Sequence, residues 1–330
     1  MKVCIVGAGA IGGWFAARLA GAGHEVSVIA RGAHLAAIRT QGLRLEQGGR
    51  QSVHPVAASD RPEDFDRQDF VFVTLKYINI EPLLERVAAM LGPNTAVVSA
   101  MNGVPWWFLR DLPGPLRGQR LESVDRGGRI SAAIGDERII GLTVRASCSV
   151  PEPGLIRHGN GTRIIAGEPA AQPGNSSARV EMLAQMMRGA GFGCEQSERI
   201  HYEVWSKVVG NLAFNPVAAL TGAYTDWLID MPETRALCAQ LVAEAFETGR
   251  RLGFAITQTP AERIAETRLL GHVRNSMLQD VERRRPLELE AILGVVVEIG
   301  ERLGLAVPYM KTLLALARMK DRMLREPASA

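Results

Sequence analysis

Hydrophobic positions follow two different spacings along the chain, and the change falls near residue 198. In the first part, short apolar runs alternate with helical patterns, which is typical of βαβ units around a mostly parallel sheet. In the second part, apolar side chains recur at the helical period. The pattern therefore predicts an α/β fold in two domains, a doubly wound sheet domain over residues 1–197 and an all-helical domain over residues 198–330.

The apolar runs also predict individual elements. Helical patterns cover residues 10–22, 78–90 and 176–190, and glycine follows the last helical leucine at Leu252-Gly253 and Leu303-Gly304, where a left-handed cap is needed. The stretches 110–135 and 168–177 are rich in glycine, proline and polar residues and are expected to be loops. The predicted strands are Val3–Val6, Val26–Ala30, Phe70–Leu75, Thr95–Ser99, Ile139–Val150 and Arg163–Ala166.

The sharpest local signal is the glycine-rich segment after the first predicted strand, Gly7-Ala8-Gly9-Ala10-Ile11-Gly12. In such a turn the first glycine allows a tight bend, the second lets the backbone approach a pyrophosphate, and the third allows close packing of helix on strand. The free N–H groups of the following helix then face the phosphates. We expect these six residues to bind a dinucleotide in a Rossmann-like domain, with a glycine-rich turn that binds no nucleotide as the alternative.

The end of the second strand indicates which dinucleotide is bound. NAD-binding domains usually place an acidic residue there, whereas this strand ends at Arg31. A guanidinium can hold a 2′-phosphate through two hydrogen bonds, so the sequence favours NADP(H), with an ordinary surface arginine as the alternative. Lys76 and Asn102 follow the next two predicted strands. Ligands of doubly wound sheets bind at these strand ends, so both side chains are candidates for the nicotinamide crevice.

Composition narrows the class of protein. The 330 residues are 47% hydrophobic and 22% charged, which fits a globular protein of about two domains. The net charge of +3 does not indicate nucleic acid as a partner, and no apolar stretch looks long enough to span a membrane. The four cysteines form no C-x-x-C pair and the six histidines show no ligand spacing. We therefore expect no metal and a reducing, cytoplasmic location.

A line of polar residues runs along the first helix of the second domain. Glu203, Lys207, Asn211 and Asn215 recur every four residues among apolar neighbours, so they share one helical face. The line is either a solvated stripe with a Glu203–Lys207 pair or a polar wall that faces a substrate. Pro216 is expected to kink or end this helix directly after Asn215.

Further polar candidates lie between residues 275 and 290. Ser276 and Asp280 stand four apart on a predicted helix. Pro286 suits a first helical position, which would place Glu288 in a first turn, where a carboxylate is favoured. Simple pairing with the helix dipole is the alternative reading of Glu288, and the run Arg283–Arg285 is interpreted as a solvated surface.

On the basis of these residues, the chain resembles the ketopantoate reductase (2-dehydropantoate 2-reductase) family along nearly its whole length. The first and shared block is the glycine-rich turn, and the middle of the chain, about 110–195, matches only in general pattern. The family-specific blocks come last. The matching residues, in chain order, are Gly7-x-Gly9-x-x-Gly12, Arg31, Val73-Thr-Leu-Lys76, Asn102-Gly103, Trp205-x-Lys207-x-x-x-Asn211-x-x-x-Asn215-Pro216, and Ser276-Met-x-x-Asp280 with Glu288.

The resemblance implies a Rossmann-like N-terminal domain and a helical C-terminal domain like that of 6-phosphogluconate dehydrogenases, with NADPH and substrate in the cleft between them. It implies hydride transfer from NADPH to the 2-keto group of ketopantoate, which gives pantoate for pantothenate and coenzyme A synthesis. By position, Lys207 would be the proton donor. Asn211, Asn215 and Ser276 would hold the substrate, Asn102 would touch both ligands, and Lys76 and Glu288 would contact the cofactor or the reacting centre.

The chain also departs from the family pattern. Asn102-Gly103 is followed by Trp106-Trp107, which could reshape the mouth of the pocket, the 110–135 stretch is longer than in short family members, and Thr225 stands near the place of a common asparagine. Two alternatives therefore stay open: an NADP-dependent reductase of another 2-keto acid, and a non-catalytic NADP-binding sensor. The apolar helices of the second domain could form a homodimer interface.

Overall fold

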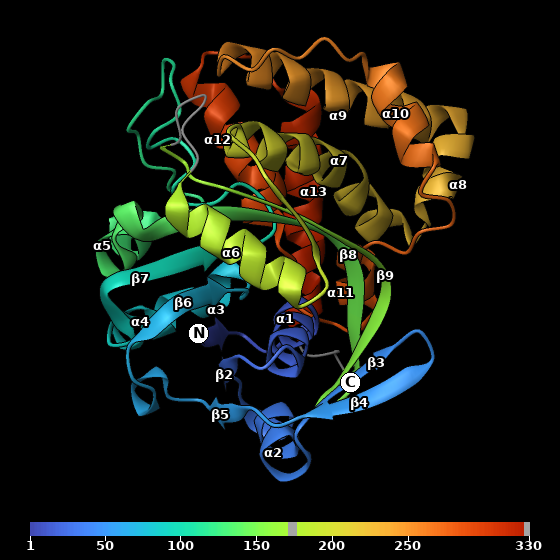
Figure 1. Cartoon of the computed structure of the whole chain (residues 1–330). Helices are drawn as coiled ribbons and strands as arrows, with labels where there is room; N and C mark the ends of the chain where they lie inside the picture. Colours follow the sequence, from blue (N-terminus) through green and yellow to red (C-terminus); the bar gives the residue numbers. More distant parts are fainter. Residues whose placement is uncertain (171–176, 327–330) are drawn as a thin grey trace. The chain divides into compact units, whose positions relative to one another are not determined.

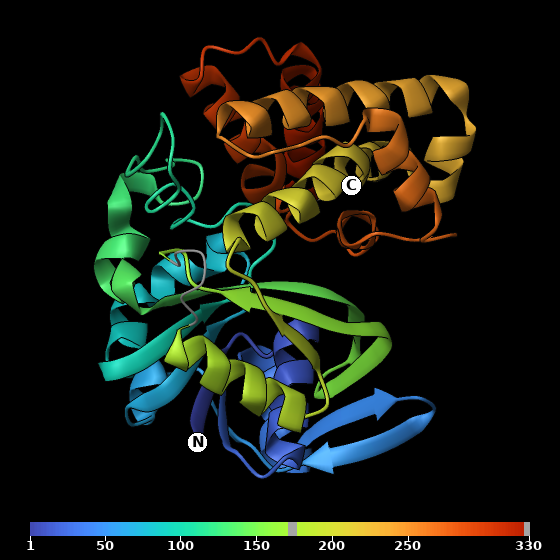
Figure 2. The same cartoon turned by 45° about the horizontal axis from the view of Figure 1, so that its top comes forward.

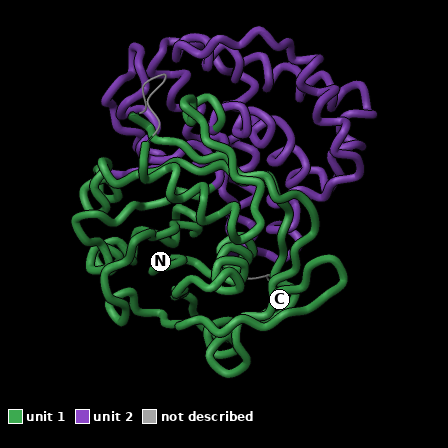
Figure 3. The backbone as a smooth tube through the Cα atoms, viewed as in Figure 1, with its two compact units in different colours: residues 1–101, 127–203 green, residues 102–126, 204–330 purple. Residues whose placement is uncertain are grey.

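The computed structural model describes residues 1–170 and 177–326, and the chain divides into two compact units (Figure 3). The sheet unit comprises Met1–Met101 and Gly127–Glu203, and the helical unit comprises Asn102–Arg126 and Val204–Ala330. The segment 102–126 thus packs with the helical unit, whereas the predicted division at residue 197 placed it with the sheet. The last boundary between the two units, between Glu203 and Val204, lies inside the helix Ile200–Thr221.

The sheet unit is built on ten strands among the described residues, in the order β4-β3-β9-β8-β7-β6-β1-β2-β5, with β10 beside β9 (Figures 1 and 2). Only β3–β4 and β8–β9 pair antiparallel in this part of the chain, so the prediction of a mostly parallel sheet is confirmed. The strands are β1 Lys2–Val6, β2 Glu25–Ile29, β3 Leu43–Gln47, β4 Arg50–His54, β5 Ala57–Ser59, β6 Gln68–Val73, β7 Leu91–Ser99, β8 Ile139–Glu152, β9 Leu155–Gly167 and β10 Gly193–Gln196.

Helices of the sheet unit differ from the prediction in two places. The helix expected over 78–90 is broken into three short turns, because Pro82 cannot supply the N–H that a continuous helix needs. The expected loop over 110–135 contains a helix near its end, Arg129–Ile134. Residues 171–176 of the expected loop 168–177 lie outside the described residues, and so does residue 176 of the helix expected over 176–190. The helices are α1 Ala10–Gly21, α2 Gly32–Gln41, α3 Tyr77–Ile80, α4 Leu84–Ala88, α5 Arg129–Ile134 and α6 Ala178–Gly189.

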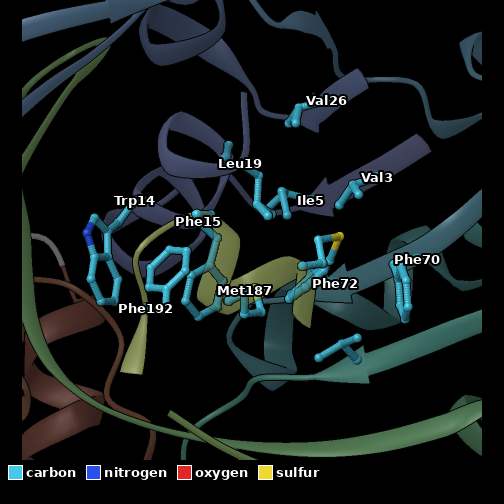
Figure 4. Packing of buried hydrophobic residues seen from close by; sticks show 14 of the residues in the cluster. Val3, Ile5, Trp14, Phe15, Leu19, Val26, Phe70, Phe72, Met187 and Phe192 are labelled. Atoms are coloured by element: carbon cyan, nitrogen blue, oxygen red, sulfur yellow. The ribbon is translucent and has the colours of Figure 1, made fainter. Parts of the chain in front are cut away.

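An aromatic cluster fixes α1 on the sheet (Figure 4). The ring of Phe192 meets the edges of Trp14 and Phe15 at centroid distances of 4.7 and 5.4 Å, and Phe15 packs on Phe72 of β6 at 5.6 Å. All four side chains are almost completely buried. Burial of rings of this size contributes several kcal/mol, so the start of α1, directly after the glycine-rich turn, is held firmly against the strands.

The helical unit contains long helices joined by short turns. Glycines with positive φ follow α9 and α12 at Gly253 and Gly304, which confirms the two predicted helix exits. Pro216 lies inside α7, which continues to Thr221. The expectation that the helix could end at Pro216 is therefore wrong. The residues after it, Val217 to Ala219, are buried, and their packing offsets the lost hydrogen bond. The helices are α7 Ile200–Thr221, α8 Thr225–Asp230, α9 Pro232–Arg251, α10 Pro260–Arg268, α11 Ser276–Glu282, a π-helical turn Glu290–Gly294, α12 Val295–Arg302 and α13 Pro308–Arg325.

Candidate active site

The glycine-rich turn has the geometry that the sequence predicts. Gly7 has φ +107°, and a Cβ on Gly12 would lie 2.0 Å from the carbonyl oxygen of Gly7, so neither position accepts a side chain. A Cβ on Gly9, by contrast, would meet no atom within 4 Å among the described residues. Gly9 is also the N-cap of α1. The open space therefore adjoins the first turn of a helix, where free N–H groups attract phosphate oxygens.

Arg31 and Lys76 follow β2 and β6, the two strands that flank β1 in the sheet. Arg31 is the N-cap of α2, is exposed, and donates from Nη2 to Oδ1 of Asn79 over 3.1 Å. Lys76 is the N-cap of α3, and its carbonyl accepts the N–H of Asn79 over 2.8 Å. Asn79 was not among the predicted site residues, since nothing in the sequence marks it. The arrangement offers a guanidinium and an amide to an anionic group, which fits a dinucleotide with a 2′-phosphate.

Lys207, Asn102 and Glu288 form one hydrogen-bonded chain inside the helical unit. Lys207 Nζ donates to Asn102 Oδ1 over 2.9 Å, and Asn102 Nδ2 lies 3.5 Å from Glu288 Oε2 as a long, weak donor. The amide therefore accepts from the cation and points its other end at the carboxylate. All three side chains are partly exposed. The cluster brings together residues that three different parts of the sequence contribute.

Close backbone contact places Asn102 in this cluster. Gly103 has φ +88°, and a Cβ there would lie 2.0 Å from the carbonyl oxygen of Ala291. The next residue, Val104, donates its N–H to that same carbonyl over 2.8 Å. Since Ala291 belongs to the π-helical turn that begins two residues after Glu288, this contact fixes the spacing between Asn102 and Glu288.

Glu288 reaches its position in a different way from the one predicted. Helical structure begins at Leu289, not at Pro286, so Glu288 directly precedes the first turn. Pro286 and Leu287 lie in a stretch without helix, where Leu287 donates its N–H to Asp321 Oδ1 over 2.7 Å. The Asp321 carboxylate thus satisfies the Leu287 N–H in this non-helical stretch, and the chain turns into the helix later.

Asn211 and Asn215 follow Lys207 along α7. Asn215 is only 6% exposed, and no side-chain hydrogen bond of either asparagine is found within residues 1–170 and 177–326. Neither amide is fully enclosed, because no side-chain atom of Asn211 or Asn215 is among the buried polar atoms of the described residues that lack a partner. Solvent or a ligand can therefore still reach both amides.

Ser276 begins α11 and is exposed. A contact with α8 holds the loop before it: His272 Nδ1 lies 2.8 Å from Asp226 Oδ2, and the His272 ring stacks on Tyr224 at 4.0 Å. Thr225 donates its N–H to the Val273 carbonyl over 3.0 Å. No hydrogen bond among the described residues joins Ser276 to the cluster around Lys207.

The pair Trp106-Trp107 does not lie open at a pocket mouth. The two side chains are 3% and 1% exposed. Trp107 packs on Phe108 at 6.5 Å, and Phe108 in turn stacks on Trp205 of α7 at 6.0 Å. The aromatic residues of the 102–126 segment therefore belong to the packing of the helical unit, and this segment is held against the helix that carries Lys207.

The described residues contain neither a candidate metal site nor a helix able to cross a membrane. No three His, Cys, Asp or Glu side chains in them stand close enough to hold a metal ion. Equally, none of their helices combines the length and apolar character that crossing a bilayer requires.

Comparison with known proteins gives consistent matches over both units. The family model for ketopantoate reductase PanE/ApbA matches residues 3–109, and the model for the C-terminal part of the same family matches residues 199–321. A 2-dehydropantoate 2-reductase from Mesorhizobium japonicum is 43% identical over 319 residues, which cover 96% of this chain and 97% of that protein.

Solved structures show the same fold. A protein from Ralstonia solanacearum MolK2, provisionally assigned as a ketopantoate reductase, has a TM-score of 0.93 and 45% identity, with 98% of each chain covered. A D-mandelate dehydrogenase crystallised with NADH and anilino(oxo)acetate shares the fold at a TM-score of 0.85 and 21% identity, over 99% of this chain and 100% of that one.

Proposed function

This chain belongs to the ketopantoate reductase family, and we propose that it reduces 2-dehydropantoate (ketopantoate) to pantoate with NADPH, a step of pantothenate and coenzyme A synthesis. The observation that carries the proposal is the hydrogen-bonded chain from Lys207 through Asn102 to Glu288. These are family motif positions, and they come together although they are distant in the sequence. A binding protein without catalysis would need only the glycine-rich turn.

The residues of the sheet unit fit NADP(H). The open space at Gly9 suits a pyrophosphate, and Arg31 and Lys76 supply positive charge at the ends of β2 and β6. In the bound state NADPH supplies the hydride that reduces the 2-keto group. We assign residues 1–197 to cofactor binding and residues 198–330 to substrate binding and catalysis, with the 102–126 segment contributing Asn102 to the latter.

Lys207 acts as the proton donor in this proposal. Negative charge develops on the carbonyl oxygen as hydride reaches the carbonyl carbon, and an ammonium group aimed at that oxygen stabilises the charge and delivers a proton. Asn102 accepts one Nζ–H of Lys207 and thereby limits the directions in which the other two point. Glu288 orients the same amide from its other side.

The uncharged polar groups hold the substrate. A keto acid of this class presents a carboxylate and a hydroxyl, and both accept hydrogen bonds from amides and hydroxyls. Asn211 and Asn215 lie one and two turns beyond Lys207 on α7, and Ser276 offers a hydroxyl at the start of α11. Binding of the substrate would give the Asn215 amide a hydrogen-bond partner.

The test is the initial rate of NADPH oxidation with ketopantoate, compared with NADH and with no keto acid. Saturable turnover that prefers NADPH supports the proposal. Turnover with another 2-keto acid from a panel, but not with ketopantoate, keeps the chemistry and replaces the substrate. Tight NADPH binding without turnover on any keto acid contradicts catalysis and favours a sensor.

The proposal also covers location and assembly. We place the enzyme in the cytoplasm, where the thiols of its four free cysteines stay reduced. No nucleic acid or membrane takes part in the reaction. A homodimer through the helical unit is supported by the apolar side chains of Leu316, Met319 and Met323 on α13, which are 56–59% exposed. Light scattering after size-exclusion chromatography measures the molar mass in solution and so distinguishes a homodimer from a monomer.

A further inference from the structure

His34 connects two parts of the sheet unit that are far apart in the sequence. Its side chain rises from the first turn of α2, the helix whose N-cap is Arg31. One ring nitrogen, Nε2, lies 2.7 Å from the carbonyl oxygen of Ala8 in the glycine-rich turn. The other, Nδ1, accepts the N–H of Gly154 over 3.0 Å. Because a backbone N–H can only donate, Nδ1 must be unprotonated, and the proton on Nε2 is the one donated to Ala8.

Both partners of the imidazole are held by other contacts. Gly154 lies between β8 and β9 with φ +76°, and a Cβ there would lie 2.9 Å from the Cβ of Ala37, so this turn presses closely on α2. Its carbonyl accepts the N–H of Arg44 over 2.9 Å. On the other side, Ala8 donates its own N–H to the carbonyl of Ile29 over 3.1 Å. His34 therefore bridges two fixed points.

The bridge controls the direction of one peptide group. In a trans peptide the carbonyl of one residue and the N–H of the next point in opposite directions. Holding the Ala8 carbonyl toward His34 consequently directs the N–H of Gly9 away from the imidazole. Gly9 is the residue beside the open space at the start of α1. A flipped Ala8–Gly9 peptide would present a carbonyl oxygen, which repels phosphate, in place of a donor.

We propose that His34, as its neutral Nε2–H tautomer, is a positioning residue for the cofactor, which keeps the Ala8–Gly9 peptide turned so that the Gly9 N–H is available to a phosphate group. The inference rests on the proposed function as regards the dinucleotide, but the bridge itself is a property of the protein alone. Burial lowers the pKa of His34, in agreement with a neutral ring. The side chain need not touch the cofactor, since it acts through the backbone of Ala8.

Three variants test the bridge, with the dissociation constant for NADPH as the readout. His34→Leu removes both hydrogen bonds and leaves the Ala8 carbonyl without its donor, so we expect NADPH to bind about 5- to 30-fold more weakly. His34→Gln keeps one donor and one acceptor and should recover most of the affinity. The control is His54→Leu, which removes a histidine of the same unit that bonds Ser52 instead of the turn, and should bind NADPH normally.

The outcomes separate positioning from general stability. Normal binding by His34→Leu, or equal losses in His34→Gln and His34→Leu at similar melting temperatures, overturns the proposal. In case His34→Leu does not fold, ¹⁵N NMR of the wild-type ring decides: the shifts should show Nε2 protonated and Nδ1 bare, and the opposite tautomer overturns the bridge. Absent turnover of ketopantoate would count against the proposed function only, because neither measurement requires the substrate.

Discussion

Lys207 Nζ donates to Asn102 Oδ1 over 2.9 Å although the two residues stand 105 positions apart. The bond joins a helix to the loop after a strand, and it aims the ammonium group. If Lys207 supplies the proton, replacing it with alanine removes a group needed only as charge develops. We expect Lys207→Ala to lower kcat by about 10²- to 10⁴-fold while NADPH binds nearly as before. Steady-state rates and a fluorescence titration with NADPH measure the two effects separately.

Lys311 provides the control for loss of a lysine. It lies on α13 in the same unit and pairs with Glu301 on the surface. Lys311→Ala should keep kcat within a factor of about two, because an exposed ion pair contributes less than about 1 kcal/mol. Near-normal turnover by Lys207→Ala would remove Lys207 from the mechanism.

Gly103 is the position where a single methyl group should uncouple Asn102 from the cluster. A Cβ at Gly103 would lie 2.0 Å from the carbonyl oxygen of Ala291, which belongs to backbone and cannot move aside cheaply. We expect Gly103→Ala to displace Asn102 and to lower kcat by at least about 10-fold, because small misplacements of a catalytic group are costly. The measurement is kcat together with the melting temperature.

A substitution at Gly118 is the control that tests the effect of backbone strain without a close contact. It lies in the same 102–126 segment with φ +75°, but a Cβ there would meet no atom within 4 Å in the described chain. Gly118→Ala should therefore cost about 1 kcal/mol of stability from the left-handed backbone and leave kcat unchanged. If both variants lose stability and activity alike, the contact with Ala291 does not position Asn102.

Arg31 is expected to determine the preference for NADPH. Its guanidinium is exposed and donates to Asn79 on the protein surface, so it can turn toward a 2′-phosphate. Arg31→Ala should weaken NADPH binding by about 10-fold or more, the loss of a charge-assisted contact, and change NADH binding little. Arg39→Ala on the same helix, where the guanidinium bonds the Ala58 carbonyl, is the control. An equal loss for both cofactors would argue against the 2′-phosphate role.

The sequence revealed the elements whose side chains carry a clear apolar signal, and missed those whose side chains do not. The parallel strands β1, β2 and β6 are buried apolar runs and were predicted within one or two residues. Strand β4 is exposed along most of its length, so its residues carry no hydrophobic signal. It pairs with β3 through the backbone, which any residue except proline can do.

The candidate site, too, could be predicted from the sequence only in part. Strand ends and helical spacing marked Lys207, Asn102 and Glu288 as candidates, and the family resemblance gave them roles. Neither could show that residues 105 and 186 positions apart share hydrogen bonds. No sequence pattern marks His34, because its partners are the backbone groups of Ala8 and Gly154. A side chain that acts on backbone leaves no pattern of matching residue types in the sequence.

The four cysteines should be inert in the native protein. Burial raises the pKa of the Cys4, Cys148 and Cys238 thiols to about 12 and that of Cys194 to about 11. At neutral pH the reactive thiolate is then a fraction on the order of 10⁻⁴ or less, against a few per cent for a free cysteine. An aromatic disulfide reagent should react negligibly with the native enzyme and leave its activity intact, whereas denaturant should expose all four thiols. A native thiol that reacts as fast as free cysteine, with loss of turnover, would show instead that a cysteine lies open near the site.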